Sequence, residues 1–184
     1  MKINRNNKID FNYVLITALA VLLSWISHEL AHWLMGESLG YNMGMSFNKC
    51  FLVNGSFKSQ QDYQMVSAAG PVFTLIQAIF IFILMKYRPS KLLYPFLFTC
   101  FYMRFFATII SIINPNDEAR ISKWLGLGKF TLPILMSALL FLLLYSISKQ
   151  YGFDRKFNLI TLGLVIFFSS VIILADQYFQ IRLL

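Results

Sequence analysis

Two histidines and a glutamate form the clearest chemical pattern in this sequence. His28 and His32 are the only histidines among the 184 residues, and Glu29 directly follows the first of them. Residues four apart in an α-helix lie on one face, so both imidazoles can reach a single metal ion. A carboxylate beside them can take a proton from a water molecule at that ion. The spacing is the H-E-x-x-H arrangement of zinc hydrolases, so it predicts a Zn2+ site at His28 and His32 with Glu29 as the catalytic base.

The sequence around this motif is strongly apolar. Between Phe11 and Gly36 the only formally charged side chain is that of Glu29. A helix needs about 20 mostly apolar residues to cross a bilayer. The motif is therefore expected to lie inside a membrane-spanning helix rather than on the surface of a soluble domain.

The composition of the whole chain is typical of a membrane protein. Hydrophobic residues make up 58% of the sequence and charged residues only 13%, whereas a soluble domain carries roughly 25% charged residues. The net charge of +8 comes from lysines and arginines scattered between apolar runs. This pattern fits basic loops at a membrane surface and excludes a nucleic-acid-binding patch. We expect a multi-pass protein embedded in the lipid bilayer of the cell membrane, or of the inner membrane in a bacterium.

The chain divides into five hydrophobic segments joined by short connections. The segments are residues 11–35, 63–85, 92–113, 130–148 and 157–175. Each is long enough, or nearly so, to span a bilayer. The predicted fold is an all-α membrane protein of about five transmembrane helices, with a short β-hairpin between the first two. Residues 1–184 are predicted to form a single domain, with a core at 11–120 and accessory helices at 130–148 and 157–175 that enclose the core or gate lateral access.

The connection between the first two segments has the pattern of a β-hairpin. Residues 45–53 and the pair Ser56 and Phe57 have the pattern of two strands around Asn54 and Gly55. Asn-Gly is the favoured pair for a two-residue hairpin turn, because both positions tolerate positive φ. Two interpretations are open: an exposed strand edge that binds an extended peptide by strand addition, or a cap over the helices.

A third metal ligand is expected at the end of the third segment. In an up-and-down arrangement the first and third helices run parallel, so their C-terminal ends lie on the same side of the membrane. Asp117 and Glu118 follow the third apolar run at a depth that suits the two histidines. Two histidines and one carboxylate are a known ligand set for catalytic zinc. Asp117 is the first candidate and Glu118 the second; the alternative is that Asp117 is an ordinary acidic residue in the loop at a helix end.

Arg104 lies in the middle of the third segment. A charged side chain is costly in hydrocarbon, so Arg104 should face protein or water. Two roles are open for it: pairing with a carboxylate near the site, or binding a lipid headgroup.

Three features together resemble the site-2 protease family, the intramembrane zinc metalloproteases. They are the H-E-x-x-H motif in the first helix, the Ala69-Gly70-Pro71 run in the second segment, and an Asn-Pro-Asp element at 114–117. The resemblance covers residues 24–120. It implies hydrolysis of peptide bonds within the membrane, with Zn2+ bound by His28, His32 and Asp117 and water activated by Glu29. It also implies that the partner is a transmembrane helix of another membrane protein, locally unwound for cleavage.

The chain differs from the family pattern at two places. The third element lacks the glycine that commonly follows the aspartate, and Thr74 stands where the family often has an asparagine. By position, the resemblance implies substrate-binding roles for Asn114 and Thr74, and for Phe51 and Val53 in the strand-forming loop.

Two other functions compete with intramembrane proteolysis. The differences in the third motif and at Thr74 favour a catalytically inactive relative that acts as a binding or chaperone module and keeps the metal for structure. A metal transporter would use intramembrane histidine and glutamate to line an ion path. The other segments carry too few polar residues to build such a path.

Overall fold

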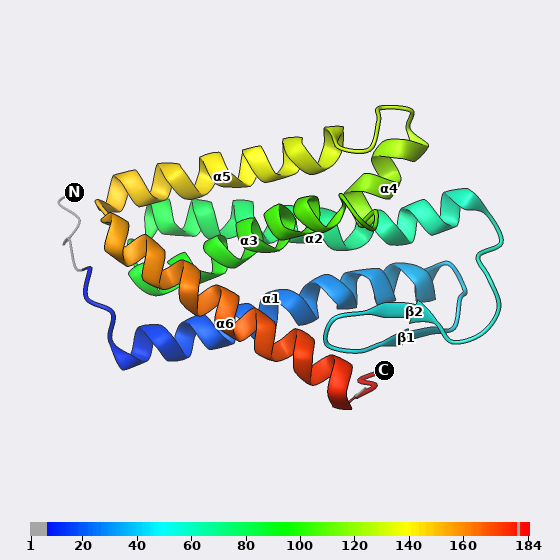
Figure 1. The fold of residues 1–184 in the computed structure, drawn as a ribbon, viewed down its shortest axis with the longest axis horizontal. Helices are drawn as coiled ribbons and strands as arrows, with labels where there is room; N and C mark the ends of the chain where they lie inside the picture. The colour runs from blue at the N-terminus through cyan, green and yellow to red at the C-terminus, as the bar shows by residue number, and fades with distance from the viewer. Residues whose placement is uncertain (1–6, 180) are drawn as a thin grey trace.

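The computed structural model describes residues 7–179 and 181–184, which form six α-helices, one 3-10 turn and one two-stranded antiparallel sheet (Figure 1). In chain order the elements are α1 (Phe11–Ser38), β1 (Met43–Met45), β2 (Cys50–Leu52), α2 (Gln60–Tyr87), η1 (Lys91–Leu93), α3 (Tyr94–Ile110), α4 (Asp117–Trp124), α5 (Thr131–Tyr151) and α6 (Arg155–Phe179). Five of these helices (α1, α2, α3 with η1, α5 and α6) are long and apolar enough to cross a membrane. The predicted all-α membrane fold with a hairpin between its first two helices is confirmed.

Local sequence sets the ends of the long helices. Asp10 caps α1 by accepting a hydrogen bond from the backbone N–H of Tyr13 at 2.8 Å. Ser59 caps α2 in the same way through the N–H of Asp62 at 3.0 Å. These oxygens satisfy backbone donors that a helix start leaves without partners. At the end of α5, Gly152 adopts φ of 66°, the left-handed conformation that stops the helix before α6 begins.

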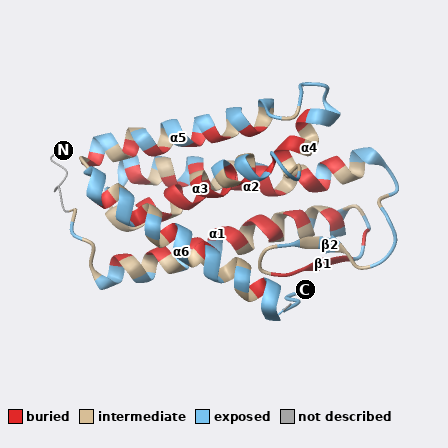
Figure 2. Cartoon of the chain, in the orientation of Figure 1, coloured by how far each residue is buried: buried red, intermediate tan, exposed pale blue. Residues whose placement is uncertain are grey.

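The helices run up and down, and α1 and α3 point the same way. Figure 1 shows both running toward the hairpin end, with α2 in the opposite direction. Buried residues such as Tyr13, Met85, Leu97 and Leu140 join the helices in one hydrophobic core. In Figure 2 the buried residues lie on the inner faces, whereas much of α5 and α6 is exposed. Because many exposed side chains are large and apolar, the outer surface suits contact with lipid.

The segment after α3 is a short helix rather than a loop. α4 starts at Asp117 and packs against α2 and α5. The bend before it is held by Asn116, whose N–H donates to Ser111 Oγ at 3.1 Å and whose side-chain amide donates to the carbonyl of Ala107 at 3.0 Å. Asp117 and Glu118 form the first turn of α4, where negative charge complements the helix dipole. The side chain of Asp117 therefore approaches the neighbouring helices from the first turn of α4.

The hairpin turn lies at residues 46–49, so the predicted turn at Asn54 and Gly55 is wrong. The N–H of Ser46 donates to the carbonyl of Lys49 at 2.8 Å and closes the loop between β1 and β2. Gly55 has a positive φ of 78°, but it lies in the connection that leads to α2. The turn is fixed by contacts far away in sequence that a local pattern does not reveal.

The end of α6 supplies those contacts. Asp176 is buried and accepts hydrogen bonds from Ser46 Oγ at 2.9 Å and from the N–H of Phe47 at 3.0 Å. The backbone of Met45 in β1 bonds to the backbone of Leu183 and Leu184. The outer edge of β1 is therefore occupied, and α6 and the hairpin form one connected unit.

Candidate metal centre

Both histidines of α1 are held by hydrogen bonds from α2. His28 Nδ1 lies 3.0 Å from Thr74 Oγ1, and His32 Nδ1 lies 2.6 Å from the carbonyl of Val66. A carbonyl can only accept, and the Thr74 hydroxyl already donates to the carbonyl of Gly70. Each imidazole therefore carries its proton on Nδ1 and presents the lone pair of Nε2. Such partners fix the tautomer and the ring orientation of metal-binding histidines.

The two Nε2 atoms face one another at 3.2 Å. Two nitrogen lone pairs at this distance repel unless a proton or a metal ion lies between or beside them. Both imidazoles are buried, with exposed fractions of 3% and 6% for His28 and His32. The pair therefore forms a preorganised position for a cation.

Asp117 completes this group. Its Oδ2 lies 3.4 Å from His28 Nε2 and 3.5 Å from His32 Nε2. The guanidinium of Arg120 pairs with the other oxygen, Oδ1. One oxygen is thus anchored and the other faces the histidines.

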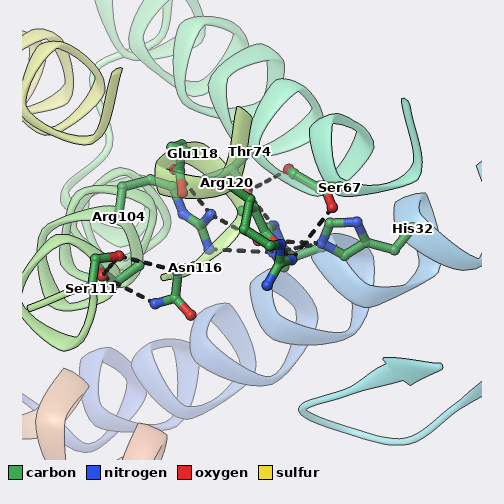
Figure 3. Close-up of polar contacts among 12 residues, drawn as sticks. His32, Ser67, Thr74, Arg104, Ser111, Asn116, Glu118 and Arg120 are labelled. Carbon is green, nitrogen blue, oxygen red and sulfur yellow. Dashed lines mark hydrogen bonds and ion pairs between the residues drawn. The ribbon is translucent and has the colours of Figure 1, made fainter. Parts of the chain in front are cut away.

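Glu118 pairs with Arg104 and does not belong to the group of converging ligand atoms. Its Oε1 lies 3.1 Å from Arg104 Nη1, and both side chains are buried. Figure 3 shows Arg104 of α3 reaching toward Glu118 of α4, with Arg120 and His32 nearby. Arg104 Nη2 lies 3.3 Å from His28 Nε2. Of the two roles open for Arg104 from sequence, the geometry gives it a carboxylate partner beside the histidines.

A cavity of about 820 Å³ opens onto this group. Glu29, the two histidines and Asp117 line it together with β2, α3 and α6. Burial raises the pKa of the Cys50 thiol, which also lines the cavity, to about 12. Cys50 does not belong to the group of ligand atoms that converge near the two histidines. The remaining acid in the cavity is Glu29, next to His28 in sequence and buried at 7% exposure.

Gly70 allows α2 to approach the histidines closely. A Cβ at this position would clash with His32 Nε2 and His28 Cε1 and would lie 2.7 Å from His28 Nε2. No side chain larger than hydrogen fits without moving the imidazoles. The glycine of the Ala69-Gly70-Pro71 run therefore faces the two Nε2 atoms directly.

Replacing Gly70 with alanine should abolish metal binding, because the new methyl group displaces one or both imidazoles. Gly163→Ala in α6 is the matched control, since a Cβ there meets nothing within 4 Å. Alanine is favoured over glycine in a helix interior by roughly 0.5–1 kcal/mol, so this control should not destabilise the protein. Bound zinc per purified chain is the measurement. Equal zinc content in both variants would contradict the assigned role of Gly70.

The other residues singled out from sequence fall at different places. Asn114 and Phe51 line the cavity. Val53 follows β2, and the cavity-lining residues do not include it. Thr74 is buried behind His28, and its hydroxyl oxygen accepts a hydrogen bond from Nδ1 of that imidazole. Arg120 was not predicted as a site residue, although an arginine three residues after Asp117 on a helix could have been recognised as its partner.

The residues of this group fit a divalent metal ion. His28, His32 and Asp117 each offer one ligand atom, and these atoms lie within 4.8 Å of one another. Two imidazole nitrogens and one carboxylate oxygen suit zinc, and leaving further coordination positions open is the pattern of a catalytic site. Hydrogen-bond partners at the Nδ1 atoms and at Asp117 Oδ1 are the surroundings that such a site needs.

Comparisons of this chain with protein-family models, with curated proteins and with solved structures find no match. Its function is therefore inferred from the geometry of the site.

Proposed function

We propose that this protein is an intramembrane zinc metalloprotease that hydrolyses peptide bonds in or near the transmembrane segments of other membrane proteins, as in regulated intramembrane proteolysis. One observation carries the proposal. Two histidine nitrogens and a carboxylate oxygen converge beside Glu29, inside a helix that is apolar enough to span a bilayer. The protein acts as a multi-pass membrane protein whose substrate is a transmembrane helix.

Metal binding and proton transfer are assigned to different residues of the site. His28, His32 and Asp117 would hold the ion. A bound Zn2+ would supply Lewis-acid activation of a water molecule and of the peptide carbonyl. Glu29 takes the proton of the attacking water and returns it to the amine as the C–N bond breaks. The resemblance to the site-2 protease family supports the same assignment.

The open edge of β2 is suited to hold an extended substrate. Gly44 and Phe51 are paired partners in the antiparallel sheet, and the backbone of Met45 is bonded on the outer side of β1. Because backbone groups alternate in direction along a strand, those of Cys50 and Leu52 point to the edge away from β1. This edge belongs to the cavity lining. A locally unwound substrate can add a strand there.

The decisive experiment measures metal and activity on the same preparation. Purified protein in detergent should contain one zinc per chain, and it should cleave a labelled transmembrane peptide with a helix-destabilising centre. A strong chelator should stop cleavage, and added zinc should restore it. A well-folded protein without metal would overturn the proposal.

One feature of the site supports the alternative, a catalytically inactive binding module. Arg104 Nη1 lies 3.7 Å from Asp117 Oδ2, and Arg120 holds the other oxygen. Two guanidinium groups could compensate this carboxylate without a metal ion. The alternative predicts a stable protein that lacks zinc and binds membrane helices without cutting them.

A further inference from the structure

We propose that Arg104 is a catalytic residue that donates a hydrogen bond to the substrate carbonyl oxygen as negative charge develops on it. This inference rests on the proposed protease function and adds a role that the metal ligands and Glu29 do not fill. As the water oxygen bonds to the carbonyl carbon, the C=O electron pair moves onto the carbonyl oxygen. It returns when the C–N bond breaks and the amine leaves with the proton carried by Glu29. Arg104 stays protonated throughout.

The hydrogen bonds of Arg104 are incompletely satisfied. Its Nη1 donates to Glu118 Oε1 at 3.1 Å and lies 3.7 Å from Asp117 Oδ2. Among the described residues, its Nε has no hydrogen-bond partner, and the one hydrogen bond of its Nη2 is to His28 Nε2, at 3.3 Å. Once the His28 Nε2 lone pair binds a metal ion, Nη2 also lacks an acceptor. A buried guanidinium with unpaired donors is costly, so an anionic oxygen arriving beside it is strongly favoured.

The position of Arg104 suits this role. The side chain is 4% exposed yet lines the same cavity as Glu29 and Asp117. Glu118 anchors one end of the guanidinium, so the other end is oriented before the substrate arrives. Preorganised donors in a water-poor site are the arrangement that stabilises charge in a transition state.

Arg120, the other arginine beside Asp117, uses its two terminal nitrogens for protein acceptors. Arg120 donates to Asp117 Oδ1, to Ser67 Oγ and to the carbonyl of Pro115. The Thr74 hydroxyl donates to the carbonyl of Gly70, on the far side of His28. Arg120 Nε also lacks a partner, but Arg104 is the arginine whose terminal nitrogen lies beside a histidine ligand atom, with Nη2 3.3 Å from His28 Nε2.

A purely structural role for Arg104 predicts a different outcome. A double variant of Arg104 and Glu118 distinguishes the structural role from the catalytic role. If Arg104 only neutralises its carboxylate neighbours Glu118 and Asp117, the double variant Arg104→Gln with Glu118→Gln should retain activity as long as it keeps its zinc, because it removes both charges of the closer pair and keeps an amide pair of similar shape. The catalytic role predicts that kcat of this double variant falls by about 10²- to 10³-fold. KM should change little. Arg155→Gln, at an exposed helix start, is the control for loss of an arginine.

Inhibitor binding provides a second readout that requires no turnover. A phosphinic peptide carries a tetrahedral anionic group and should bind the double variant about 10- to 100-fold more weakly than wild type. A peptide thiol, which contacts the metal through one sulfur, should bind both proteins equally. Zinc content should equal that of wild type. An unchanged kcat and unchanged phosphinate affinity in a zinc-loaded double variant would overturn the role of Arg104 alone, whereas absence of zinc from wild type would overturn both the role and the protease function.

Discussion

Replacing Glu29 with glutamine should abolish peptide hydrolysis and leave zinc binding intact. The amide has nearly the shape of the carboxylate but cannot accept a proton from water. A positioned acid–base group typically contributes about 10²- to 10⁴-fold to rate, so kcat should fall by at least that amount. The measurement is cleavage of the labelled transmembrane peptide, with bound zinc determined on the same sample.

Glu37→Gln is the matched control for this variant. Glu37 lies in the same helix, is exposed, and accepts a hydrogen bond from the N–H of Met43 through an oxygen that glutamine retains. This variant should cleave at the wild-type rate. Cleavage that persists in Glu29→Gln with zinc bound would remove Glu29 from the mechanism and would favour another base.

Local periodicity was enough to predict the helical half of the site. The spacing of His28 and His32 requires only that residues four apart share a helix face, and a long apolar run guarantees the helix. The parallel course of the first and third helices follows from their order along the chain. These two arguments together brought Asp117 to the correct depth, and the structure brings its Oδ2 to the two Nε2 atoms.

The parts that sequence reasoning missed depend on contacts between distant segments. The hairpin turn is set by Asp176, about 130 residues beyond Ser46, and it overrides the local preference of Asn54 and Gly55 for a turn. The choice between Asp117 and Glu118 as the third ligand depends on α4. This helix has only eight residues and is too polar to be recognised as one of the apolar segments. Its acidic first turn and its lysine in the last turn were the available signal.

The adjacent carboxylates Asp117 and Glu118 on α4 face different partners, so substitutions at the two positions should have different effects. Asp117→Asn should lose zinc, since an amide oxygen replaces a charged ligand. The loss of affinity should exceed the roughly 10- to 100-fold that changes in the surrounding hydrogen bonds usually cost. Glu118→Gln should keep one zinc per chain, because its Oε1 contacts Arg104 rather than the histidines.

The two variants should also differ in stability. Glu118→Gln leaves the buried Arg104 with a neutral partner, so the free energy of unfolding should fall by about 1–3 kcal/mol. Zinc competition with a chelator and thermal unfolding of both variants, measured with and without zinc, test the assignment. Zinc should raise the unfolding temperature of Glu118→Gln and not that of Asp117→Asn, because only a protein that binds the ion in its folded state is stabilised by it. The reverse pattern would make Glu118 the third ligand and would require α4 to rotate its first turn toward the histidines.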